Sequence, residues 1–224
     1  MTATTTPETV PDAAADTGAT ALSPLDLAPV IPVVVIEDVA HAVPVARALL
    51  AGGVPVIELT LRTAAALDAT RAIAAEVPEL VLGVGTVTTS DQAEAAVAAG
   101  ARFLVSPGAT DRLLDGMLAT GVPFLAGTAG PTDVIRLLER GITEAKLFPA
   151  ETVGGIGMLK ALGGPFGQMR FCPTGGISPD NAGAYLALPN VGCVGGSWLT
   201  PAALQRAGDW DGITALARAT NSLR

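Results

Sequence analysis

The sequence predicts an α/β protein whose parallel strands close into a single (β/α)8 barrel, or TIM barrel. Three observations favour this fold class. A chain of 224 residues is a length that one α/β barrel routinely uses as a single domain. A composition with 26 glycines and only 4% aromatic residues suits close packing of helices on a sheet. A unit of helix, glycine and strand also recurs from about residue 29 onward.

The repeated unit is an alanine-rich amphipathic stretch, a glycine and a short β-branched or aromatic run. It can be followed in "LLAGGVPVIELTL", "VAAGARFLVSP", "LATGVPFLAG" and "LERGITEAKLFP". Gly100, Gly121 and Gly141 stand where a helix C-cap is needed, just before the chain turns into a strand. Helices that alternate with strands in this way predict a parallel sheet.

Signals for the starts of helices agree with this alternation. Thr89 and Gln92 in "TSDQ" have the spacing of a capping box, and Pro131 suits the first turn of a helix. Thr110 precedes apolar residues at helical spacing. The local signals are therefore mutually consistent.

Eight strands are expected. They lie near residues 30–35, 54–61, 80–84, 102–106, 123–126, 143–148, 169–173 and 191–195. Because units of roughly twenty residues are slightly compact for a closed barrel, a doubly wound open sheet is the structural alternative. Such a sheet usually carries G-x-G-x-x-G after its first strand, which "IPVVVIEDVAHAVP" lacks. Polar residues instead recur at strand ends, so the barrel is favoured.

The charge balance limits the partners. Thirteen basic and 21 acidic residues give a net charge of −8, which repels nucleic acids and anionic membranes. A phosphorylated small molecule must then be held by local groups. His41 is the only histidine, so a histidine-rich zinc site cannot be assembled within one subunit, and a Ser-His-Asp triad would have to use this one residue. Cys172 and Cys193 lack CxxC spacing and are interpreted as buried free thiols of a cytoplasmic protein.

The opening "MTATTTPETVPDAAADTGAT" has neither the basic and apolar regions of a secretory signal nor the arginines of a transit peptide. Residues 1–25 are therefore expected to be a disordered tail, and residues 26–224 the barrel. The longest uncharged run, residues 181–205, is interrupted by Pro189, Asn190 and several glycines, which argues against a transmembrane helix.

The second strand, "VPVIELTLR", carries charges on one of its two faces. Alternation places Ile57, Leu59 and Leu61 on one face, and Glu58 and Arg62 on the other, which in a barrel is the interior. Buried charges are costly unless they pair or serve a ligand, so a structural salt bridge is the alternative. Function is favoured because the charges lie toward the C-terminal ends of the strands, where barrel active sites are found.

The sixth strand repeats this pattern with Lys146 and Phe148 on the inward face. Burial disfavours the charged form of an amine, and a neutral amine is what attack on a carbonyl requires to form a Schiff base. The alternative is a buried lysine that only neutralises Glu58. Lys160, the other lysine, follows "GGIGML" on a helical stretch and is interpreted as a surface charge. Lys146 is therefore the predicted nucleophile.

Two glycine pairs follow the last two strands, in "PTGGIS" and "GGSW". In a barrel, backbone N–H groups at this place commonly hold a phosphate without much positive charge. A turn is the alternative for each pair alone. The residues concerned are Thr174, Gly175, Gly176, Gly195, Gly196 and Ser197. Thr86, at the end of the third strand, could donate to a carboxylate or cap the following segment.

Taken together, these stretches resemble the family of 2-keto-3-deoxy-6-phosphogluconate (KDPG) aldolases, which are also called 4-hydroxy-2-oxoglutarate (KHG) aldolases. The similarity covers roughly residues 30–201 through "HAVPVARALLAGGVPVIELTLRT", "VGTV", "SPG", "AKLFPAE", "GPFGQMRFCPTGGIS" and "VGGSWL". The resemblance implies a cytoplasmic class I aldolase of the Entner-Doudoroff pathway, with no metal and no cofactor. Its partners would be a keto acid and a phosphorylated aldehyde, and its assembly a homotrimer.

The resemblance also implies roles for the residues. Lys146 would form the Schiff base and Glu58 would act as general acid and base. The substrate-binding residues would be Arg62 and Thr86 at the keto-acid carboxylate, Phe148 beside the lysine, Thr174 near the reacting carbons, and Gly175, Gly176, Gly196 and Ser197 at the phosphate.

The fifth-strand loop departs from the family pattern. It reads "AGTAGPT", with Ala126 where such enzymes often have proline and Gly130 near the usual threonine. A galactonate-derived epimer of the substrate therefore stays open. The shorter, unphosphorylated KHG also stays open as a substrate, although Ser197 and the glycine pairs favour a phosphate. A sugar-phosphate epimerase and a catalytically silent relative are the alternative functions.

Overall fold

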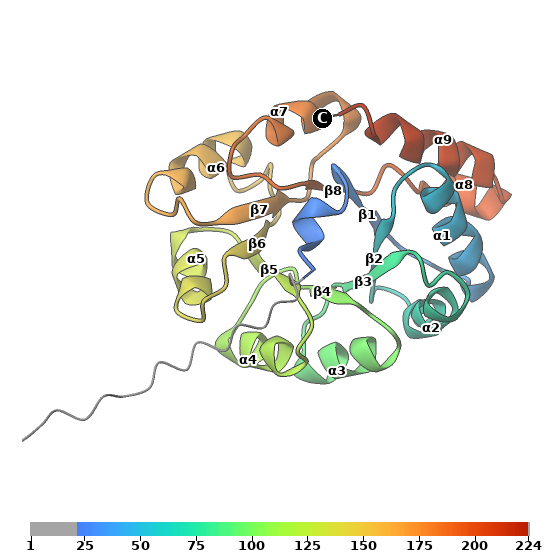
Figure 1. The fold of residues 1–224 in the computed structure, drawn as a ribbon, viewed down its shortest axis with the longest axis horizontal. Helices are drawn as coiled ribbons and strands as arrows, with labels where there is room; N and C mark the ends of the chain where they lie inside the picture. The colour runs from blue at the N-terminus through green and yellow to red at the C-terminus, as the bar shows by residue number, and fades with distance from the viewer. Residues whose placement is uncertain (1–21, 224) are drawn as a thin grey trace, which may run out of the picture.

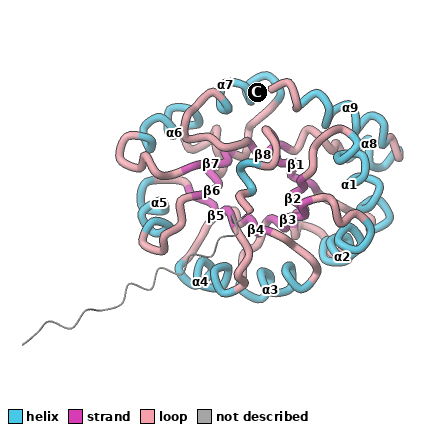
Figure 2. The backbone as a smooth tube through the Cα atoms, viewed as in Figure 1, coloured by secondary structure: helices cyan, strands magenta, loops and turns pink. Residues whose placement is uncertain are grey.

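Eight parallel strands form a ring enclosed by helices in the computed structural model, which describes residues 22–223 (Figure 1). Figure 2 shows the strands as an inner ring and the helices as an outer one. The strand order is β7-β6-β5-β4-β3-β2-β1-β8. Bridges from Phe171 to Val191 and from Thr174 to Gly195 connect β7 to the β8 side and close the ring. The predicted (β/α)8 barrel is confirmed.

The eight strands fall where the sequence predicts them. They are β1 (Val30–Val34), β2 (Val56–Thr60), β3 (Val81–Gly85), β4 (Phe103–Val105), β5 (Phe124–Thr128), β6 (Glu144–Leu147), β7 (Arg170–Pro173) and β8 (Val194–Gly196). The largest difference is at β8, which begins three residues later than expected. Val191 makes only an isolated bridge, and Gly192 passes so close to Leu25 that a Cβ there would lie 2.6 Å from the Leu25 Cβ.

Helices cover the outside of the ring. They are α1 (Ala42–Ala51), α2 (Ala66–Glu76), α3 (Ser90–Ala98), α4 (Asp111–Ala119), α5 (Pro131–Leu138), α6 (Gly155–Gly163), α7 (Pro179–Leu186), α8 (Ala202–Ala207) and α9 (Trp210–Thr220), with the 3-10 turns η1 (Pro24–Asp26) and η2 (Val39–His41). The longest described helices have 11 residues, whereas a bilayer span needs about 20. No helix within residues 22–223 is long and apolar enough to cross a membrane.

The predicted helix caps are largely confirmed. The hydroxyl of Thr110 accepts a hydrogen bond from the Leu113 N–H at 3.3 Å. The hydroxyl of Thr89 accepts one from the Gln92 N–H at 3.2 Å, but the Gln92 side chain accepts from Thr88 instead of closing the box on Thr89. Pro131 occupies the first turn of α5.

A short N-terminal segment closes the lower end of the barrel, at the N-terminal ends of the strands. The Leu25 side chain is fully buried, and Asp26 pairs with Arg170 at the start of β7. The hydroxyl of Ser23 donates to the Glu144 carboxylate at 2.8 Å. The expected tail, residues 1–25, lies outside the described residues apart from residues 22–25. These four already belong to the barrel, because burial of Leu25 and the polar contact of Ser23 hold them in place.

Candidate active site

Glu58 and Lys146 meet inside the barrel, although 88 positions separate them in the sequence. Glu58 lies on β2 and Lys146 on β6, and both side chains face inward as the alternation predicts. The Lys146 Nζ donates to Glu58 Oε1 at 3.1 Å and lies 3.5 Å from Oε2. Lys146 is only 4% exposed and Glu58 only 2%. An amine and a carboxylate in contact, shielded from bulk water, can exchange a proton directly.

Glu58 reaches this position because a glycine faces it from β3. A Cβ built on Gly85 would lie 2.2 Å from Glu58 Oε1, closer than any side chain allows. Gly83, two residues earlier on the same face, leaves room for the buried Phe103 ring, which its Cβ would approach to 2.1 Å. This role of the two glycines was not predicted from the sequence. The alternation of glycine in "LGVG" within a strand was the available signal.

Hydrogen bonds between strands fix the backbone beside the nucleophile. The hydroxyl of Thr128, at the end of β5, donates to the Lys146 carbonyl at 3.0 Å. The hydroxyl of Ser106 accepts from the Gly127 N–H, and Gly127 is the register partner of Lys146. Lys146 therefore projects from a strand whose position is set on the β5 side. Ala126, one of the departures from the family pattern, is fully buried in the same strand as Gly127.

Phe148 lies beside this pair, and Arg62 and Thr86 lie beside each other. The Lys146 Nζ lies 5.2 Å from the centre of the Phe148 ring, within the range of a cation–π contact. The Arg62 Nε donates to the Thr86 hydroxyl at 3.2 Å, so the two residues expected at the carboxylate do lie together.

Thr86 has an unusual backbone conformation. Its φ of 61° is the only positive φ of a non-glycine residue between residues 22 and 223. A β-branched residue in this region is strained, and such strain persists where the surroundings or a function require it. The sequence indicated no such conformation. Thr86 directly follows β3, and its strained backbone sets the position of the hydroxyl that accepts the hydrogen bond from Arg62.

A cavity of about 210 Å³ adjoins Arg62 and the predicted phosphate loops. Its volume is below that of pockets for drug-sized ligands and suits a small charged group. The cavity is lined by Val33, Arg62, Phe148, Thr174, Gly175, Gly176, Ile177, Gly195 and Ser197. Besides Arg62, five of the predicted binding residues thus line this cavity: Phe148, Thr174, Gly175, Gly176 and Ser197.

Gly196 differs from its neighbours because it does not line this cavity. A Cβ at Gly196 would lie 2.2 Å from the Trp198 ring, so this residue lets the chain pass close to an aromatic side chain. Gly195 lines the cavity instead, and a Cβ there would lie 2.1 Å from the Thr174 hydroxyl oxygen. The part of Gly196 in phosphate binding stays a prediction.

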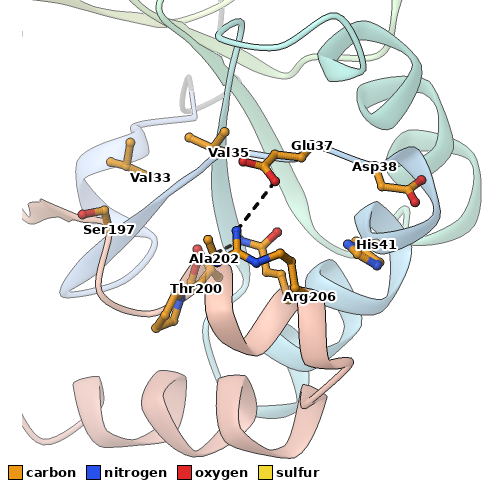
Figure 3. A pocket seen from close by; sticks show the side chains of 11 residues that line it. Val33, Val35, Glu37, Asp38, His41, Ser197, Thr200, Ala202 and Arg206 are labelled. Atoms are coloured by element: carbon orange, nitrogen blue, oxygen red, sulfur yellow. Dashed lines mark hydrogen bonds and ion pairs between the residues drawn. The ribbon is translucent and has the colours of Figure 1, made fainter.

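A second cavity, of about 360 Å³, shares Val33 and Ser197 with the first (Figure 3). Figure 3 shows Glu37 and Arg206 facing each other across it, with 3.9 Å between their charged atoms. Asp38 also lines it, and two carboxylates repel a phosphate. An anion is therefore better placed on the side of the glycine pairs.

The remaining reactive side chains take no part in the Lys146–Glu58 contact, although Cys172 on β7 is the register partner of Lys146. Cys172 and Cys193 are free and buried, as the sequence predicts. His41 packs edge-on against Trp210, with 5.6 Å between ring centres. Among residues 22–223, no three His, Cys, Asp or Glu side chains gather closely enough to hold a metal ion.

Comparisons with known proteins agree with this geometry. A family model described as "KDPG and KHG aldolase" matches residues 22–216. A 2-dehydro-3-deoxy-phosphogluconate aldolase from Pseudoalteromonas atlantica is 54% identical over 190 residues, which cover 85% of this chain and 88% of that protein. A KHG/KDPG aldolase from Escherichia coli is 51% identical over 194 residues, which cover 87% and 91% of the two chains.

A solved structure also matches the barrel closely. The KDPG aldolase of Legionella pneumophila, crystallised with pyruvate captured at low pH as a covalent carbinolamine intermediate, superposes with a TM-score of 0.87 at 45% identity. The match covers 88% of this chain and 96% of that one.

Proposed function

Because this chain belongs to the KDPG and KHG aldolase family, we propose that it is a class I aldolase acting through a Schiff base on Lys146. The substrate is 2-dehydro-3-deoxy-6-phosphogluconate, which is cleaved reversibly to pyruvate and D-glyceraldehyde 3-phosphate. KHG, cleaved to pyruvate and glyoxylate, is a second substrate. The observation that carries this proposal is the buried contact of 3.1 Å between the Lys146 Nζ and Glu58.

The first half of the reaction attaches the substrate. Glu58 takes a proton from the Lys146 ammonium group, and the free amine attacks the C2 ketone to give a carbinolamine. Glu58 gives this proton to the carbinolamine hydroxyl, which leaves as water, and Glu58 is again a carboxylate. The iminium that remains has a positive nitrogen that can accept an electron pair. The carbinolamine captured in the Legionella pneumophila enzyme is the adduct expected from such an attack.

The second half breaks the carbon–carbon bond. The Glu58 carboxylate removes the proton of the C4 hydroxyl, the C3–C4 electron pair moves into the C2–C3 bond, and the aldehyde leaves. Pyruvate remains as an enamine on Lys146. The protonated Glu58 returns its proton to C3, and water hydrolyses the resulting iminium. One carboxylate within hydrogen-bond reach of the amine can serve both proton transfers.

The surrounding residues hold the two ends of the substrate. Arg62, with Thr86, binds the carboxylate beside the ketone, because a guanidinium fork fits a carboxylate. Phe148 covers the lysine. The glycine loop at Gly175 and Gly176 binds the phosphate through backbone N–H groups. Arg62 and the glycine loop line the same cavity, and Phe148 connects this cavity to Lys146.

The phosphate assignment predicts a preference between the two substrates. We expect the wild-type kcat/KM to be at least about tenfold higher for the phosphorylated keto acid than for KHG, since charge-assisted hydrogen bonds are the strong ones. Ser197→Asp, which adds a negative charge to the cavity wall, should remove this preference. Steady-state kinetics on both substrates measure it.

Ser222→Asp is the matched control, because Ser222 is an exposed serine in the C-terminal segment whose hydroxyl bonds only to the Ala219 carbonyl. It should leave both kcat/KM values unchanged. A wild type that prefers KHG, or a Ser197→Asp variant that keeps the preference, would contradict the phosphate assignment.

The gluconate and galactonate forms of the substrate differ at one hydroxyl near the β5 loop. A Cβ added at Gly130, the N-cap of α5, would meet no atom within 4 Å, so the loop is open at this point. The galactonate epimer therefore remains the alternative to the gluconate form. The homotrimer and the cytoplasmic location that the family implies stay predictions, and the two free buried thiols are compatible with a reducing compartment.

A further inference from the structure

The motif "KLFPAE" ends in Glu151, a residue that has no part in the reaction described above. Its carboxylate accepts a hydrogen bond from the hydroxyl of Tyr185 on α7, the only tyrosine of the chain. Tyr185 is fully buried, whereas Glu151 is an exposed residue just beyond the end of β6. The contact connects two βα units that are 34 positions apart in the sequence.

Glu151 lies directly behind the glycine loop. A Cβ on Gly176 would lie 2.5 Å from the Glu151 Cγ, so the loop packs against this side chain. The Glu151 N–H also donates to the Gly175 carbonyl at 3.1 Å. Both glycines have a positive φ, of 98° and 80°, which leaves the loop few constraints of its own. Its shape therefore depends on contacts with neighbouring segments, which are Glu151 and the Asn181 side-chain amide that donates to the Gly176 carbonyl at 3.0 Å.

The hydrogen bond from Tyr185 also acts on the negative charge of the Glu151 carboxylate. Burial raises the pKa of the Tyr185 hydroxyl above its ordinary value, and the hydrogen bond to Glu151 raises it further, so the hydroxyl remains a donor at neutral pH. A carboxylate beside a phosphate site repels the ligand. Held by Tyr185, the Glu151 carboxylate is turned toward α7 and its charge is partly compensated.

We propose that Tyr185 and Glu151 form a positioning pair that keeps the Gly175–Gly176 loop in shape for phosphate and thereby sets the preference for phosphorylated substrates. This inference rests on the proposed function, because it takes the loop as the phosphate site. Neither residue touches the reacting atoms. The pair acts on substrate affinity through the loop and leaves the chemistry at Lys146 unchanged.

Tyr185→Phe removes one oxygen and tests the pair. We expect KM for the phosphorylated keto acid to rise about tenfold, as for the loss of one charge-assisted hydrogen bond, while kcat stays within about twofold. KM and kcat for KHG, which has no phosphate, should stay within about twofold. Inhibition by inorganic phosphate should weaken in parallel. Wild-type turnover of the phosphorylated keto acid tests the proposed function separately.

Two further variants make the test specific. Glu151→Gln keeps an acceptor for Tyr185 and the packing against Gly176, so KM for the phosphorylated substrate should stay within about twofold. Thr220→Val is the matched control for a lost buried hydroxyl, because Thr220 donates only to the Ala217 carbonyl in α9. Thr220→Val should alter thermal stability but leave KM unchanged for both the phosphorylated keto acid and KHG.

An equal rise of both KM values in Tyr185→Phe would overturn the proposal, and so would an unchanged KM for the phosphorylated substrate. A tenfold rise of that KM in Glu151→Gln would also overturn it, even if Tyr185→Phe did not fold.

Discussion

Lys146→Met is expected to lower kcat/KM for the phosphorylated keto acid by about 10⁴-fold or more, because it removes the nucleophile. Methionine is unbranched and fills irregular buried space, so the barrel interior can accept it. The Glu58 carboxylate then loses its buried partner, and the melting temperature should fall as well. Steady-state kinetics together with a thermal melt measure both effects.

Lys160→Met is the matched control. Lys160 is an exposed residue in the last turn of α6, and apart from Lys146 it is the only lysine of the chain. Surface substitutions usually leave stability almost unchanged, so the variant should fold normally. Because Lys160 is not the proposed nucleophile, kcat/KM should stay within about twofold of the wild-type value. Retention of most of the activity by folded Lys146→Met would show that Lys146 is not the nucleophile.

Glu58→Gln is expected to lower kcat by about 10²- to 10⁴-fold, the usual range for loss of a general acid–base group. Glutamine has nearly the same shape, so the space beside Gly85 still accommodates it. The amide can accept a hydrogen bond from the amine but cannot take up a proton. The variant should therefore still form some imine with pyruvate and yet turn over slowly. Rapid quench kinetics and adduct trapping separate the two steps.

Wild-type turnover by Glu58→Gln would assign the proton transfers to another group. A complete failure to form the imine would instead place the main role of Glu58 before the bond cleavage, in freeing the amine.

The barrel and its reacting pair could be predicted from the sequence because both depend on short-range regularities. The alternation in "VIELT" and "EAKLF" sets the inward parity of Glu58 and Lys146, and closure of a barrel brings inward residues of different strands together. The caps at Thr110 and Gly141 depend only on neighbouring residues, and they too were predictable.

Other features depend on contacts between distant segments and carry no local pattern. The need for glycine at Gly85 arises from the Glu58 side chain on the neighbouring strand. The contact of Tyr185 with Glu151 joins α7 to the segment after β6, and the residues next to either one in the sequence do not predict this contact. The left-handed conformation of Thr86 runs against the preference of a β-branched residue, so propensity predicts the opposite.

Borohydride reduction in the presence of pyruvate, followed by peptide mass spectrometry, tests the central claim most directly. Reduction converts an iminium on lysine into a stable secondary amine, which marks the residue that carried it. We expect the adduct on Lys146 and none on Lys160. An absence of any adduct, or an adduct confined to Lys160, would contradict the Schiff-base mechanism.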